Sequence, residues 1–285
     1  MMQSPKRVAP IGEERDREIL KEAATYIYQE RPQGPLQVHA FFPEESTTKD
    51  QGLRPGMVFF HGGFWDAPTP TQFVPHCLHF ASRGAVAVAA ETRSFNRHQT
   101  TALEAIEDAR DAVRWLRHNA EEFRIDPDRI IVGGAAGGAL QALMTSMPKA
   151  KLLTSIDGLD CRAQAILLFS ALVNPLSHPT ASKRFADSKA AKSMSPLRHI
   201  RRKLPPILAF HGKADRITPF AEVQRFCRKA RFWGNRCELV DFDRADHSFF
   251  NFNVSHERFE STIGAADRFL VDLGLLEAEK EEVLC

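Results

Sequence analysis

The chain has 285 residues, of which 43% are hydrophobic, and a formal net charge of +2. This length and composition predict one large core and therefore a single α/β domain. Its Lys and Arg residues are scattered, so we expect no nucleic-acid-binding surface. The N-terminus is charged and no apolar run is long enough to span a membrane, so we expect no signal peptide, no membrane partner and a cytoplasmic protein. Widely spaced cysteines without a C-x-x-C pair indicate reduced thiols and no zinc site.

The order of apolar and polar residues predicts alternating strands and helices. Residues 13–22 are predicted to form a charged amphipathic helix, and extended segments follow at 25–29 and 36–42. The next predicted strands are residues 57–60, 85–90, 130–132, 163–169, 207–210 and 238–242. The predicted helices are residues 73–83, 102–122, 140–146, 222–233 and 257–273. This alternation predicts a mainly parallel sheet with helices on both faces and ligands at the carboxyl ends of its strands.

The domain organisation follows from the same pattern. We expect an N-terminal helical extension at residues 1–24, a single domain at 25–276 and a C-terminal tail at 277–285. Residues 174–202 are rich in Ser, Ala and Lys and contain no predicted strand, so they are expected to be an insertion over the sheet. Together with the N-terminal helix, this insertion is expected to form a small cap.

Residues 130–139 carry the most informative motif, in which an apolar run and a glycine cluster precede a helix-forming run. This is the strand, sharp turn and helix of a nucleophile elbow, G-x-S-x-G, on residues 133–137. The middle position should be Ser and is Ala135, whose methyl group cannot attack a carbonyl carbon. A generic glycine-rich turn is the alternative. A P-loop would need a Gly-Lys-Ser/Thr end, and a dinucleotide-binding loop would need another glycine spacing.

The loop His61-Gly62-Gly63-Phe64-Trp65 directly follows the predicted strand at 57–60. Successive glycines let backbone N–H groups point into a cavity, where two such donors can hold an oxyanion. The alternative is a tight turn with a stacked tryptophan.

Asp215 and His247 follow two later predicted strands. An Asp in the first position could orient a histidine by accepting its Nδ1 proton, although Asp is also an ordinary loop and helix-capping residue. A histidine in the second position, before the last helix, could act as a general base. The order elbow, acid, histidine is the chain order of α/β hydrolases.

Together these motifs resemble the α/β-hydrolase superfamily, and within it the esterase/lipase branch with an HGG oxyanion loop, which is hormone-sensitive-lipase-like and close to the bodyguard-type feruloyl and acetyl esterases. The resemblance covers about residues 25–273. It implies an α/β-hydrolase fold, carboxylic ester substrates with short acyl chains, and no cofactor or metal. It assigns Ala135 to the nucleophile position, Asp215 and His247 to the acid and base, Gly62, Gly63 and Ala136 to the oxyanion hole, and His61, Phe64 and Trp65 to the substrate pocket.

The missing serine leaves several functions open. Loss of the nucleophile should lower turnover by about six orders of magnitude and leave ~10³ over the rate in water. The chain is thus an esterase silenced by an engineered Ser→Ala change, or a natural pseudo-hydrolase that binds a small ester-like ligand or a protein, much as the plant gibberellin receptors resemble this branch. Ser170 or Ser94 could act as a substitute nucleophile, but neither residue lies on the elbow. A purely structural protein would have a closed pocket. Whether the protein forms a homodimer is left open by the sequence.

Overall fold

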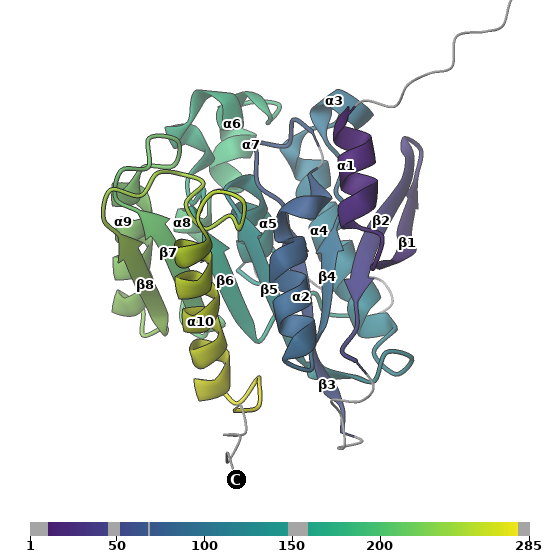
Figure 1. Cartoon of the computed structure of the whole chain (residues 1–285). Coiled ribbons are helices and arrows are strands. Elements are labelled where there is room, and N and C mark those ends of the chain that lie inside the picture. The colour runs from purple at the N-terminus through teal and green to yellow at the C-terminus, as the bar shows by residue number, and fades with distance from the viewer. Residues whose placement is uncertain (1–10, 45–51, 68, 148–158, 279–285) are drawn as a thin grey trace, which may run out of the picture.

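The sheet of this computed structural model is mainly parallel and contains every strand of the described residues, which are 11–44, 52–67, 69–147 and 159–278. Its order is β1-β2-β4-β3-β5-β6-β7-β8, in which β2 pairs antiparallel with β1 and β4 and all other neighbours are parallel (Figure 1). The strands are β1 Ala24–Arg31, β2 Gly34–Phe41, β3 Arg54–Phe60, β4 Val86–Ala90, β5 Ile125–Ala135, β6 Ala165–Phe169, β7 Ile207–Gly212 and β8 Cys237–Phe242. The predicted fold class is therefore confirmed.

Helices cover both faces of the sheet. The longer ones are α1 Ile11–Ile19, α2 Val74–Ser82, α4 Ala102–His118, α5 Gly137–Met144, α9 Phe220–Phe232 and α10 His256–Asp272. The short ones are η2 Pro70–Phe73, α3 Phe95–His98, η4 Pro175–Ser177, α6 Pro179–Lys183, α7 Ser188–Ser193 and α8 Pro196–His199. None of the described helices combines the length and apolar character needed to cross a membrane.

The strand alternation divides the core into two layers. On β3, Met57 and Phe59 pack into one cluster with α2 and α10, and Val58 and Phe60 pack into the other with α4, α5 and α9. Figure 1 shows α2 and α10 side by side on the near face of the sheet. Because successive side chains of a strand point to opposite faces, a strand buried on both sides is almost wholly apolar.

Helix α4 begins and ends at identifiable signals. The Thr101 hydroxyl accepts a hydrogen bond from the Leu103 N–H, and the Glu104 carboxylate accepts one from the Thr101 N–H, which forms a capping box. The helix ends at His118 and not at residue 122 as predicted, because the chain turns to enter β5, with Arg124 at a φ of +55°. The apolar period alone did not reveal this turn.

The segment at residues 174–202 forms η4, α6, α7 and α8 and no strand, as predicted. It packs around Trp65, which shares a buried cluster with Ala181, Phe185 and Ala191. The expected domain boundaries stay a prediction, and residues 1–10 and 279–285 of the expected extension and tail lie outside the described residues.

Candidate active site

The turn between β5 and α5 has the strained geometry of a nucleophile elbow. Strand β5 ends at Ala135, α5 begins at Gly137, and Ala136 between them has a φ of +46° and a ψ of −112°. A non-glycine residue rarely adopts this conformation, and the elbow residue is the strained one. The apex is therefore Ala136 and not Ala135, so the predicted position was wrong by one residue.

The glycine pairs on either side explain this error. Both Gly133-x-Ala135-x-Gly137 and Gly134-x-Ala136-x-Gly138 fit the spacing G-x-A-x-G. Pairing decides between them, because Ala135 is still in register with Phe169 of β6. A Cβ on Gly138 would collide with the carbonyl oxygens of Phe60 and His61, so the last glycine of the second pattern is required for helix α5 to approach β3. Neither register supplies a hydroxyl.

The two serines considered as replacement nucleophiles are buried. Ser170 is fully buried at the end of β6, and its hydroxyl donates a hydrogen bond of 2.7 Å to the carbonyl oxygen of His247. Ser94 is 1% exposed and precedes α3. Neither residue lines the cavity described below, so neither can replace the missing hydroxyl in this conformation.

His247 and Asp215 lie together as the sequence predicts. The distance from Nδ1 of His247 to Oδ2 of Asp215 is 2.9 Å, and the Thr218 hydroxyl lies 3.1 Å from the same nitrogen. The Asp215 carboxylate also accepts hydrogen bonds from the N–H groups of Ile217 and Thr218. With Nδ1 facing a carboxylate, the lone pair of the neutral imidazole is left on Nε2.

The Asp215 carboxylate is held in its charged form. Burial alone would raise its pKa, but the hydrogen bonds from His211 and His247 outweigh burial and lower the pKa well below its usual range. His211 is completely buried, and its Nε2 lies 3.3 Å from Oδ2 of Asp215. No sequence motif assigns a role to His211, although it lies at the end of β7, the strand that leads to Asp215. An acid fixed in this way orients the histidine permanently.

The predicted oxyanion donors are arranged differently from the expectation. The Ala136 N–H donates a hydrogen bond of 3.1 Å to the Phe169 carbonyl, because strand pairing continues to the apex. Ala136 was therefore wrongly assigned as a donor, and the N–H after the apex is that of Gly137, which donates to the Gly63 carbonyl at 3.0 Å. The Gly62 N–H donates to Oε1 of Gln72 at 2.5 Å. The N–H groups of Ala136, Gly137 and Gly62 thus each have a partner within the chain.

A cavity of about 870 Å³ opens at this site. Ala135, Ala136 and His247 line it, so the elbow and the histidine face one space. Gly62 and Gly63 line it as well. This volume lies within the ~300–1,000 Å³ of ordinary small-molecule sites, which contradicts the expectation of a closed pocket in a purely structural protein.

The predicted pocket residues divide into one that lines the cavity and two that do not. Phe64 lines it and stacks on His178, with ring centroids 4.2 Å apart. His61 and Trp65 are buried away from the cavity, because the His61 ring bonds the Gly62 carbonyl and the Trp65 ring packs edge-on against Phe185. Trp65 is thus packed inside the protein, although edge-on against Phe185 and not stacked as in the alternative of a tight turn.

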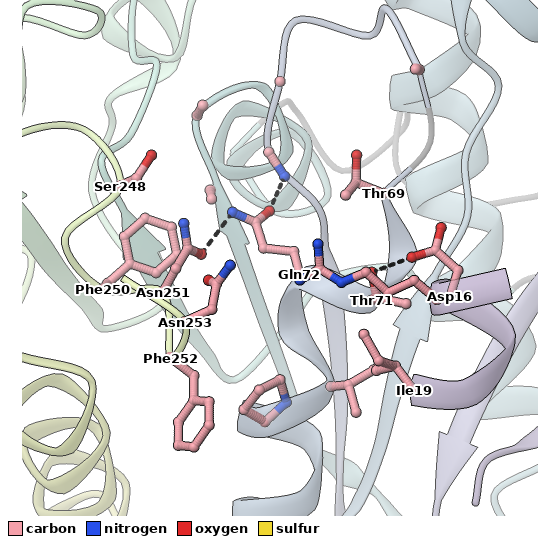
Figure 2. Close-up of a pocket in the computed structure, with 18 of the residues that line it drawn as sticks. Asp16, Ile19, Thr69, Thr71, Gln72, Ser248, Phe250, Asn251, Phe252 and Asn253 are labelled. Carbon is pink, nitrogen blue, oxygen red and sulfur yellow. Dashed lines mark hydrogen bonds between the residues drawn. The ribbon is translucent and has the colours of Figure 1, made fainter. Parts of the chain in front are cut away.

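Several lining residues were not found from the sequence. Helix α1 forms one wall, with Asp16 accepting a 2.9 Å hydrogen bond from the Thr71 hydroxyl and Ile19 facing the cavity (Figure 2). The loop after β8 contributes Asn251 and Phe252 on the opposite side (Figure 2). Helix α1 thus forms part of the cavity wall, whereas the segment at 174–202 contributes no lining residue and contacts the lining residue Phe64 through His178.

The next question is whether side chains of the described residues could bind a metal ion. In the described part of the chain, no group of three or more His, Cys, Asp or Glu side chains is arranged to hold a metal ion. Cys77, Cys161, Cys227 and Cys237 are buried and form no disulfide bond in the described part of the chain, and Cys285 lies outside the described residues. The site places an oriented imidazole beside a backbone loop at a cavity lined by both apolar and polar side chains, which suits acid–base chemistry on an organic ligand.

Fold and site together define an α/β hydrolase of the esterase branch. Residues 44–229, more than half of the chain, match the BD-FAE family model, and the chain belongs to that family. The apo form of esterase 2 from Thermogutta terrifontis is 33% identical and superposes with a TM-score of 0.83, covering 91% of this chain and 98% of that one. The structure of the same esterase with propionate bound is also 33% identical, with a TM-score of 0.83 over 92% and 98% of the two chains.

Curated relatives are similar over shorter stretches. The probable carboxylic ester hydrolase LipM of Mycobacterium tuberculosis is 27% identical over 63% of this chain and 46% of its own length. The probable isoprenylcysteine alpha-carbonyl methylesterase ICMEL1 of Oryza sativa subsp. japonica is 24% identical over 78% of this chain and 56% of its own length. The chain thus spans about half the length of these relatives. They are carboxylesterases, and they support an esterase scaffold.

Proposed function

We propose that this protein binds a small carboxylic ester, or the carboxylate made from it, and does not hydrolyse it. The observation that carries this proposal is a methyl group at both Ala135 and Ala136, beside a cavity that His247 still lines. A hydrolase of this class needs a hydroxyl on the elbow, held next to the imidazole. The base and its orienting acid are present here without a group to activate.

The ligand class follows from the cavity and from the relatives. The cavity carries apolar side chains at Val74, Ile217 and Phe250, which would take up an alkyl or aromatic part of a ligand. Structures of the Thermogutta esterase hold propionate and butyrate. We propose ligands of the same class for this chain, with an acyl part of a few carbons.

Each site residue has a proposed role in binding. Nε2 of His247 would donate a hydrogen bond to an ester or carboxylate oxygen when the imidazole is protonated. Asp215 would keep the ring in one orientation. The N–H groups of Gly62 and Gly63 would face the ligand carbonyl. Catalysis would remain at the small residual level that oxyanion stabilisation and binding give without a nucleophile.

The first experiment restores a hydroxyl at each of the two positions. Hydrolysis of p-nitrophenyl acetate and butyrate is measured for the chain itself, for Ala136→Ser and for the matched variant Ala135→Ser. We expect Ala136→Ser to exceed the parent by at least about 10³-fold, since a triad nucleophile contributes about 10⁶. Ala135→Ser should stay near the parent rate, because residue 135 precedes the strained turn. Adding His247→Ala to Ala136→Ser should abolish the gain.

Two results would contradict the proposal. Esterase-level turnover by the unmodified chain would show that another nucleophile operates. If both serine variants are folded and inactive, and if neither methyl butyrate nor butyrate binds the parent chain in an NMR titration, the cavity serves a ligand of another class.

A further inference from the structure

Gln72 lies at the cavity between two loops. The first is the predicted oxyanion loop at residues 61–65, and the second is the loop after β8 that carries His247 and Asn251. Its Oε1 accepts a hydrogen bond of 2.5 Å from the Gly62 N–H, and its Nε2 donates one of 3.0 Å to Oδ1 of Asn251. Figure 2 shows the side chain extended toward Asn251, with both hydrogen bonds dashed. All three residues line the cavity. One carboxamide thus joins two loops on either side of the elbow.

The bond to Gly62 uses a donor that a ligand would need. A carboxylic ester presents a carbonyl oxygen, and the oxyanion loop is where this class of site accepts it. The carboxamide oxygen of Gln72 has the same chemical character and already occupies that N–H. A backbone N–H has a single hydrogen, so it serves Gln72 or a ligand but not both fully.

The close contact at Gly62 strengthens this interpretation. A Cβ on Gly62 would lie 3.1 Å from Oε1 of Gln72 and 3.4 Å from the Cβ of Ala135. The carboxamide oxygen of Gln72 and the Cβ of Ala135 thus both lie close to Gly62, which lines the cavity. Both polar ends of Gln72 have a partner inside the chain, so its departure costs two hydrogen bonds.

We propose that Gln72 is a gate of the binding site, a built-in substitute for the ligand carbonyl that must rotate away before an ester binds. This inference rests on the proposed function and deepens it, because it adds a residue that controls affinity. The ligand replaces the carboxamide oxygen at the Gly62 N–H, and Asn251 loses its partner at the same time. The apparent affinity is lowered by the fraction of molecules in which the gate is closed.

A purely structural brace is the competing account, and two substitutions distinguish it. Gln72→Ala removes the occupant and frees the Gly62 N–H. Gln72→Glu keeps the length and places a carboxylate on the same N–H, which is a stronger acceptor. A gate predicts that the two variants change affinity in opposite directions. A brace predicts that both weaken binding, since both disturb the bridge to Asn251.

The test is the dissociation constant for methyl butyrate, measured by NMR titration at pH 7 on the full chain and its variants. We expect at least fivefold tighter binding in Gln72→Ala and at least threefold weaker binding in Gln72→Glu. Asn251→Ala, which releases one end of the gate, should fall between the parent and Gln72→Ala. Gln29→Ala on β1, which is outside the cavity lining, is the matched control and should equal the parent. If Gln72→Ala does not fold, Gln72→Met replaces it, because it removes the amide at nearly unchanged length.

The outcomes separate the gate from the proposed function. Equal or weaker binding by Gln72→Ala, in a parent that does bind, overturns the gate and leaves the function standing. Absence of binding by the parent and by every variant overturns both. The predicted order, with Gln72→Ala tightest and Gln72→Glu weakest, supports both.

Discussion

The Nδ1 atom of His247 lies 2.9 Å from Oδ2 of Asp215, in a site whose elbow residues carry only methyl groups. A general base and its orienting acid are thus kept in hydrogen-bonding geometry without the hydroxyl that they would activate. In Ala136→Ser, this pair should become functional. Adding Asp215→Asn to that variant should lower kcat by about 10⁴-fold, because the amide stabilises the wrong tautomer. The p-nitrophenyl butyrate assay measures this change, and an unchanged kcat would remove Asp215 from the proposed mechanism.

The strained apex gives a prediction that does not depend on activity. Ala136→Gly should stabilise the fold by about 1 kcal/mol, because glycine adopts a positive φ without the penalty that Cβ imposes. Ala135→Gly is the matched control and should destabilise by about 0.5–1 kcal/mol, since residue 135 lies in a strand. Urea unfolding midpoints measure both. If Ala135→Gly stabilised the fold and Ala136→Gly did not, the strained residue of the turn would be Ala135 and not Ala136.

His76 on α2 should make the fold sensitive to acid. Its ring is completely buried among Phe59, Phe73 and Phe169, and both ring nitrogens lack a hydrogen-bond partner in the described part of the chain. Burial lowers the pKa of His76 from 6.5 to about 3. The unfolded chain binds the proton first, so this contribution is present above pH 6.5 and is lost as the pH falls toward 3.

The expected loss between pH 7 and pH 5 is ~2 kcal/mol from this residue alone. Urea unfolding at the two pH values measures this loss of unfolding free energy. The variant His76→Phe separates the contribution of His76 from that of the other titrating groups. The variant should lose about 2 kcal/mol less than the parent over this interval. Identical pH dependence in the two proteins would mean that His76 gains a partner or water when protonated.

The carboxylate of Asp108 on α4 is predicted to be a strong contributor to stability. It is fully buried and receives hydrogen bonds from the Arg93 N–H at 2.9 Å, the Arg93 guanidinium at 2.8 Å and Arg31 at 3.0 Å. Asp108→Ala should cost about 3–5 kcal/mol, because it removes the principal partner of the buried Arg93 guanidinium. Asp111→Ala on the same helix, at a partly exposed carboxylate, should cost about 1 kcal/mol or less. Equal unfolding free energies for the two variants would contradict this account.

The sequence predicted the order of strands and helices and the loops that hold Asp215 and His247, because motifs at the ends of parallel strands meet at one edge of the sheet. It could not separate Ala135 from Ala136, since two overlapping glycine patterns have the same spacing. The backbone conformation of Ala136 and the pairing of Ala135 with Phe169 decide between them.

The side-chain contacts around the cavity could not be predicted from the sequence for another reason. Gln72 and Asn251 are 179 residues apart, and neither belongs to a motif. His61 and Trp65 belong to a motif, but their side chains point into the protein and are buried, and Trp65 packs against Phe185. Which side of a loop a side chain occupies depends on packing, and packing is set by residues from the whole chain.

The hydrogen bond between Asp16 and Thr71 has a consequence for how the site can change during evolution. Helix α1 forms a wall of the cavity, yet it lies outside residues 44–229, which match the family model. A wall supplied by a short peripheral helix can vary in length and charge without altering the sheet that holds the elbow and the histidine. We therefore expect that exchanging α1 between relatives changes which ligand the cavity accepts and leaves the sheet unaltered.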